Sequence, residues 1–494
     1  MRSPDRDRLP ANLFGKVQRY SRRDFFSSFA NGLHGSALAY LFGIDLAAPR
    51  NIMARGSESG IADVRAKGPH FTPKAKSVIH LFMNGGPSQV DLFDPKPMLK
   101  KYEGQPPSRE LANDIEFIEQ AGGMMPSPFK FSKCGESGIE VSELLPHLSQ
   151  QVDEITLIRS MFTTHFNHEP AVYMMQTGRL FTGHPSLGSW VVYGLGTENQ
   201  NLPAYVVLDD PKGLPVNGIQ NWQSGWLPPV YQGTRMRSEG SPLLNLKPQE
   251  EFPGPVSEFA RSIVHRLDSR HREARPGNPE LDARIASYEL AARMQMSATD
   301  ALDISQESAA TQEMYGLNND VTASYGRRCL MARRLVERGV RFVQIFIESQ
   351  IWDNHSNLKT ELGACCAKTD QPAAALLKDL KQRGLLDSTL VIWGGEFGRL
   401  PLSQMRSMNA GRDHGPGGFT SWLAGGGVKK GHVHGATDEI GYKAVTDPVS
   451  PHDFHATLLH LLGMDHERLV FNHNGLNERL SGVEPARIVE GILA

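Results

Sequence analysis

The sequence predicts an α/β fold with a mostly parallel central sheet and long loop insertions, and two observations predict it. Short apolar runs, such as 77–83, have the length and composition of strands that are buried on both faces. A strand, a helix and a second strand then follow one another at 340–347, 372–383 and 388–393. This order is typical of parallel strands whose connecting helices cover the sheet. With 494 residues, of which 39% are hydrophobic, the chain can bury a sizeable core.

The remaining elements follow in chain order. The strand at 77–83 runs into Asn84-Gly85-Gly86-Pro87, a composition typical of a tight loop. Further strands are predicted at 154–159 and 204–208, and a helical region at 256–304. Residues 211–255 are rich in Pro and Gly, so we expect them to form a long insertion without regular structure.

Charge and cysteine content exclude several classes of protein. Lys and Arg number 52 and Asp and Glu number 54, so the net charge is −2. No global basic field is present to hold nucleic acid or an anionic membrane. The four cysteines include no Cys-x-x-Cys pair, which supports neither a disulfide framework nor a zinc ribbon.

The N-terminus resembles an export signal. Residues 21–26, with the pair Arg22 and Arg23, are similar to a twin-arginine signal, and the apolar stretch at 29–48 is too polar for a stable membrane span. The alternative is a surface helix with a chance Arg pair. We expect the twin-arginine translocation machinery to carry the protein to the periplasm or the extracellular space. The expected division is a signal region, a linker, one domain and a C-terminal tail, at 1–48, 49–74, 75–480 and 481–494.

Polar side chains follow the predicted strand ends. They are carboxylates, imidazoles and one amide from segments far apart in the chain: Asn84, Asp353, His355, Glu396, Asp413 and His414. Ligands of open α/β sheets bind beyond the carboxyl ends of the strands, and such oxygen and nitrogen donors bind divalent metals. We therefore expect a metal site there. The alternative for each pair of Asp and His is a capping Asp beside a surface His.

The same loops offer groups that suit an anion. The backbone N–H groups of Gly85 and Gly86 can cradle an oxyanion, and we place Ser88 in the same cradle. Arg399 can clamp a sulfate or phosphate through two hydrogen bonds, or it can pair with a surface acid instead. Ser88 is not flanked as in a Gly-x-Ser-x-Gly nucleophile elbow, which disfavours a serine esterase.

These motifs together resemble those of the DUF1501 family, exported proteins of unassigned function that resemble the alkaline phosphatase/sulfatase superfamily. The resemblance is carried by 82–96, 352–355, 395–399 and 411–415. It implies an alkaline-phosphatase-like three-layer sandwich and a divalent metal ion, namely zinc, calcium, magnesium or manganese. In that pattern Asn84 stands where the superfamily places a metal-binding Asp, and His434, rather than His432, resembles its last metal-binding His.

One position departs from the superfamily pattern. Sulfatases carry a Cys or Ser nucleophile followed by Pro and, further on, by Thr-Gly-Arg; here Pro170 and 177–179 are kept, but His168 stands at the nucleophile position. A formylglycine made from Cys or Ser is therefore excluded at this position. His168 can be a metal ligand, it can be a nucleophile or an acid/base group, or catalysis has been lost.

The residues and the resemblance lead to two hypotheses. The first is an exported metal-dependent hydrolase of sulfate or phosphate esters, with a small molecule or a polysaccharide as substrate and with His168 and Arg399 near the reacting group. The second is a catalytically silent exported protein that binds polysaccharide or a protein partner through the same pocket. The missing nucleophile favours the second hypothesis.

Export is testable directly. Replacing both Arg22 and Arg23 with Lys is expected to leave the precursor in the cytoplasm, because the arginine pair is the feature that the export machinery reads. Cell fractionation and immunoblotting measure the outcome. Normal export of the double variant would contradict the assignment.

Overall fold

The computed structural model describes residues 64–113, 115, 118–239, 254–405, 407 and 409–494. The predicted signal region and most of the linker lie outside these residues. The chain divides into two compact units, and the described part of the smaller one is the helix α8 (Gly254–Glu273) with the few residues after it. The larger unit holds all the other elements described below.

An eight-stranded sheet forms the centre of the larger unit. Seven strands run in one direction and β11 runs against them, as the pairing of β11 with β4 and β8 shows. Across the sheet the strands lie in the order β12 (His432–His434), β4 (Ile155–Met161), β11 (Phe419–Ala424), β8 (Thr389–Gly394), β1 (Ser77–Phe82), β7 (Phe342–Phe346), β5 (Tyr205–Leu208) and β6 (Thr234–Met236). The predicted α/β class with a mostly parallel sheet is confirmed.

Every strand predicted from the sequence is present, with ends shifted by one or two residues. These strands are β1, β4, β5, β7 and β8. Almost all of their residues are buried, so their sequences are continuous apolar runs. Strands β6, β11 and β12 were not predicted. Strands β6 and β12 have only three residues each, too few for a periodic pattern.

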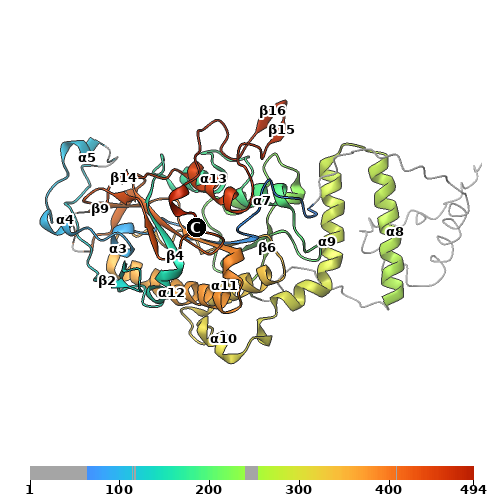
Figure 1. The fold of residues 1–494 in the computed structure, drawn as a ribbon, viewed down its shortest axis with the longest axis horizontal. Helices are drawn as coiled ribbons and strands as arrows, with labels where there is room; N and C mark the ends of the chain where they lie inside the picture. Colours follow the sequence, from blue (N-terminus) through green and yellow to red (C-terminus); the bar gives the residue numbers. More distant parts are fainter. Residues whose placement is uncertain (1–63, 114, 116–117, 240–253, 406, 408) are drawn as a thin grey trace, which may run out of the picture. The chain divides into compact units, whose positions relative to one another are not determined.

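Helices cover both faces of the sheet and make three layers (Figure 1). Side chains on one face, among them Ile79 and Leu81 of β1, pack with α11 (Ala323–Glu337) and α12 (Leu358–Gln382). Val78 and Phe82 of the same strand face the other way and share a second core. That core includes residues of α6 (His168–Thr177), α7 (Leu187–Leu195) and α13 (Pro451–Leu461).

The helix predicted at 372–383 is longer than expected. It begins at Leu358, so Pro372 lies inside α12 rather than at its start. Pro favours the first turn of a helix, because its missing N–H and its ring disrupt an interior turn. Here Pro372 is buried with most of its neighbours, and this tertiary packing outweighs the local cost. The helical region at 256–304 is likewise two helices, α8 and α9 (Pro279–Leu302), separated at Pro276 and Gly277.

The predicted insertion and the predicted C-terminal tail both contact the rest of the domain. The insertion at 211–255 contributes β6, which pairs with β5 at one edge of the sheet. The predicted tail at 481–494 also packs onto the domain: the N–H of Val489 donates to Thr457 Oγ1, and the N–H of Ala494 donates to the carbonyl of Gly427. Within the described residues, no helix combines the length and apolar character needed to cross a bilayer.

A buried ion pair joins the short helix after β1 to the strand that carries His414. Arg412 Nε lies 2.6 Å and Nη2 3.1 Å from the two carboxylate oxygens of Asp91, and both side chains are 0% exposed. Asp91 belongs to α3 (Gln89–Leu92), and Arg412 begins β10 (Arg412–Gly415). Removing one partner of such a pair leaves an uncompensated buried charge.

Arg412→Met is therefore expected to lower the free energy of unfolding by about 3–5 kcal/mol. Urea denaturation followed by circular dichroism measures the change. The double variant Asp91→Met/Arg412→Met removes both charges and is expected to cost less than the single variant. A single variant that costs less than about 1 kcal/mol, the range of exposed pairs, would contradict a stabilising role for this contact.

Candidate metal centre

The candidate centre lies where β1, β7 and β8 end side by side. These three neighbouring strands are parallel, so their carboxyl ends bring the loops at 84–87, 347–355 and 395–397 together. Gly85 permits this approach, because its φ is 107° and a Cβ there would lie 2.6 Å from the backbone nitrogen of Asp353. The first loop therefore requires glycine at this position.

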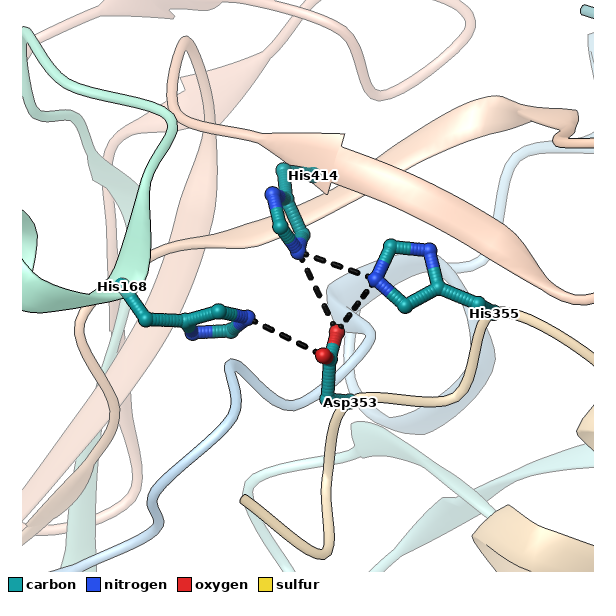
Figure 2. Close-up of side chains that lie close together, drawn as sticks. All are labelled: His168, Asp353, His355 and His414. Atoms are coloured by element: carbon teal, nitrogen blue, oxygen red, sulfur yellow. Dashed lines mark hydrogen bonds and ion pairs between the residues drawn. The ribbon is translucent and has the colours of Figure 1, made fainter. Parts of the chain in front are cut away.

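Four predicted residues meet at this edge: His168, Asp353, His355 and His414 (Figure 2). One side-chain nitrogen or oxygen atom from each lies within 4.8 Å of those from the other three. His168 is the first residue of α6, Asp353 and His355 come from the loop after β7, and His414 lies on β10. These three segments are far apart in the sequence.

Two imidazoles converge on one oxygen of Asp353. His355 Nε2 lies 2.8 Å and His414 Nε2 3.2 Å from Asp353 Oδ1, and the two nitrogens are 3.1 Å apart. Ligand atoms in a tetrahedral zinc shell are about 3.3 Å apart, given Zn–N and Zn–O distances near 2.0–2.1 Å. The three atoms therefore have the chemistry and the spacing of one face of a metal site.

His168 approaches from the other side of the same carboxylate. Its Nε2 lies 3.2 Å from Asp353 Oδ2, while its Nδ1 lies 2.6 Å from Glu396 Oε1. Only 10% of the His168 side chain is exposed, and Asp353 is the partner of its Nε2. The Oε2 atom of the fully buried Glu396 has no hydrogen-bond partner. A buried polar atom without a partner is costly, so Oε2 indicates a position where a further group binds.

Each of two imidazoles has an oriented partner on its second nitrogen. His355 Nδ1 hydrogen-bonds to Gln404 Oε1, and His168 Nδ1 to Glu396 Oε1. An amide or carboxylate oxygen accepts a proton from Nδ1, so the Nε2 atoms of both rings face the centre of the group. Partners of this kind fix the ring orientation of metal-ligating histidines.

The pKa values respond to burial and to these contacts. Burial opposes ionisation of Asp353, but the contacts with His168, His355 and His414 and the charge of Arg399 hold its pKa well below the usual range. Burial also opposes the charge on His168, yet the carboxylates of Asp353 and Glu396 raise the pKa of its imidazole. For His414 burial prevails over Asp353 and lowers the pKa, which favours the neutral imidazole that a metal requires.

Arg399 lies at the centre, and its guanidinium group contacts protein groups. Its side chain is 1% exposed, and Nη2 donates to Asp353 Oδ1 at 2.6 Å. Nε donates to the carbonyl of Gly86 at 2.9 Å, Nη1 donates to another backbone carbonyl, and Nη2 also contacts two more. The structure therefore places Arg399 as a link between loops, and not as the clamp on a sulfate or phosphate that the sequence suggested.

Two groups of the predicted oxyanion cradle contact other protein groups. The N–H of Gly85 donates to Glu396 Oε1 at 2.9 Å, and the carbonyls of Gly85 and Gly86 accept from Arg399. Ser88 is buried and donates its hydroxyl proton to Asp91 Oδ2. The N–H of Gly85 and the hydroxyl of Ser88 are therefore both held by carboxylates of the protein.

The remaining predicted ligands lie around or outside the group. Asn84 donates its amide to the carbonyl of Ile347, and its Oδ1 has no partner. Asp413 flanks the group, with Oδ1 3.9 Å from His355 Nδ1. His434 lies on β12 at the far edge of the sheet, where Gly491 packs on its ring. Glu396 touches the group only through His168.

Gln404 is a site residue that the sequence did not indicate. It follows β9 (Gly398–Ser403) and contacts His355 although the two are 49 positions apart. A glutamine between Ser403 and Met405 has no pattern that distinguishes it from any surface glutamine. Only the antiparallel pairing of β9 with β10 brings it to the centre.

The chain belongs to a protein family described as "Protein of unknown function (DUF1501)", whose model matches residues 75–493. The match extends past the predicted domain end at 480 and includes the C-terminal segment that packs onto the domain. None of the curated proteins matches the sequence.

Several solved structures resemble the chain at low identity. A sulfatase from Pseudoalteromonas sp. is 13% identical, with 80% of this chain and 68% of the other covered and a TM-score of 0.34. The lipoteichoic acid synthase of Listeria monocytogenes is 10% identical (82% and 77% covered, TM-score 0.36). An alkaline phosphatase superfamily protein from Vibrio parahaemolyticus is also 10% identical (84% and 72% covered, TM-score 0.33). The class of the fold itself rests on the strand order given above.

Metal binding can be measured on ligand variants. Asp353→Asn and His414→Ala are each expected to lower zinc affinity by about a hundredfold or more in a site with few ligands, because the first removes the negative charge of a ligand and the second removes a donor atom. His434→Ala, outside the group, serves as the matched control and is expected to bind like the wild type. Metal analysis after loading with zinc, calcium, magnesium or manganese gives the result. A wild-type protein without stoichiometric metal would refute the site.

Proposed function

We propose that this protein is an exported metal-dependent hydrolase of sulfate or phosphate esters that lacks the formylglycine nucleophile. The observation that carries the proposal is the convergence of His355 and His414 on Asp353 Oδ1, with His168 at the opposite oxygen. Two imidazoles and a carboxylate that leave open positions are a ligand set found in hydrolytic metal sites. A metal bound there supplies positive charge that polarises an ester oxygen.

The proposed metal is zinc. Imidazole nitrogens suit zinc and neighbouring transition metals, whereas calcium and magnesium take oxygen ligands almost exclusively. Asp353, His355 and His414 would hold it, and two of these three donors are nitrogens. Calcium and magnesium, which the superfamily resemblance left open, fit this donor set poorly.

His168 is proposed to move the proton. Glu396 engages its Nδ1, so Nε2 is the nitrogen that gives or takes a proton. During hydrolysis the bond between sulfur or phosphorus and the alcohol oxygen breaks, and that oxygen takes a proton from His168 Nε2. The attacking water supplies the oxygen of the new acid and returns a proton to the same nitrogen. This assigns to His168 the acid/base role among the three that the sequence left open.

A His168 variant tests this role. His168→Ala is expected to lower turnover of aryl sulfates or phosphates by about a hundredfold or more, while zinc content and folding stay near wild type. His165→Ala is the matched control, because His165 lies three residues earlier, stacks on Phe166 and does not belong to the four-residue group. Activity is measured with and without a chelator.

Two results would contradict the proposal in different ways. If zinc content falls together with activity in the His168 variant, His168 is a ligand and not the acid/base group. If the zinc-loaded wild type turns over no ester, the protein is a binding module for polysaccharide or a protein partner. The variant would then change ligand affinity alone.

A further inference from the structure

We propose that Arg399 is a positioning residue that holds the metal ligands in place before any metal binds. The inference rests on the metal site of the proposed function but concerns how that site is assembled. It assigns to Arg399 a role in metal affinity in place of contact with substrate.

The contacts of the guanidinium group carry the inference. Nε donates to the carbonyl of Gly86 at 2.9 Å, and Nη1 donates to that of Arg412 at 3.2 Å. Nη2 donates to Asp353 Oδ1 at 2.6 Å and also contacts the carbonyls of Gly85 and Trp352. One side chain thus joins the loop after β1, the loop that carries Asp353 and the strand that carries His414.

The backbone of Arg399 is held as firmly as its side chain. Its N–H donates to Gln89 Oε1 at 2.8 Å, and its carbonyl accepts from Gln89 Nε2 at 2.8 Å. Gln89 opens α3 and is itself 2% exposed. A guanidinium group that starts from a fixed backbone and ends on fixed carbonyls constrains every loop it touches.

Charge explains why an arginine suits this position. The carboxylate of Asp353 has 19% of its side chain exposed and faces three imidazoles. Arg399 provides a permanent positive charge at the oxygen that His355 and His414 share, so Asp353 keeps its position without a metal ion. A metal then meets ligands that are already arranged, and less of its binding energy is used to order the loops.

Lysine cannot reproduce this geometry. Its ammonium carries the same charge, but its three donors radiate from one nitrogen and cannot reach carbonyls on three separate segments. Arg399→Lys is therefore expected to weaken zinc affinity about 10–100-fold, the usual effect of losing a group that orients metal ligands. Competition with a chelating dye measures the affinity. The zinc-dependent rise in Tm should shrink in parallel, because ligand-induced stabilisation follows affinity.

Arg328→Lys is the matched control. Arg328 is also fully buried, donates Nη2 to Asp210 Oδ2 at 2.5 Å and Nη1 to the carbonyl of Phe346 at 2.8 Å, and shares none of these partners with Arg399. It therefore carries a similar structural cost. We expect zinc affinity within about twofold of wild type, because sites without shared partners act independently.

The possible outcomes separate this inference from the proposed function. A wild-type protein that binds no zinc refutes the proposed function and this inference with it. A wild type that binds zinc, with an Arg399→Lys variant of equal affinity, refutes this inference alone. Arg399→Gln, which leaves no buried ammonium, is the second variant. If both Arg399 variants fail to fold while Arg328→Lys folds, Arg399 stabilises the whole domain and the assignment to the metal site is overturned.

Discussion

The carboxylate of Asp353 is the group on which the arrangement of the centre depends. His355 and His414 reach one of its oxygens, His168 the other, and Arg399 holds the shared oxygen from the protein side. A carboxylate with so many neighbours cannot rotate or move without losing several contacts at once. The carboxylate of Asp353 therefore fixes the positions of the side chains around it, and through them the positions of the loops that carry them.

This acid is held in place by the register of three parallel strands. Strands β7 and β8 flank β1, and Phe82 lies opposite Phe346 on one side and Gly394 on the other. All three strands thus end at the same edge of the sheet, so the loops that follow them begin next to one another. A shift of one residue in β1 would turn its side chains to the opposite faces and would move the Gly85 loop away from Asp353.

The sequence predicts the residues of the centre that stand next to a recognisable local pattern, such as a strand end or a motif. Asp353, His355 and His414 stand near strand ends, and His168 stands at a recognisable spacing from Pro170 and 177–179. Whether a polar side chain faces a ligand or the protein depends on packing, which the sequence does not display. Arg399 therefore looked like an anion clamp although it is 1% exposed. Pro372 is a similar case: its local propensity indicates the start of a helix, but it lies inside a buried one.

The position of the last residues has a consequence for the order in which the chain can fold. Ala494 donates to Gly427, and Lys429 donates its N–H to Ile492, immediately before the edge strand β12. Strand β12 pairs with β4, which lies more than half the chain away in the sequence. This edge of the sheet is therefore complete only when segments far apart in the sequence have come together. Folding is expected to be slow, because contacts between distant segments form late.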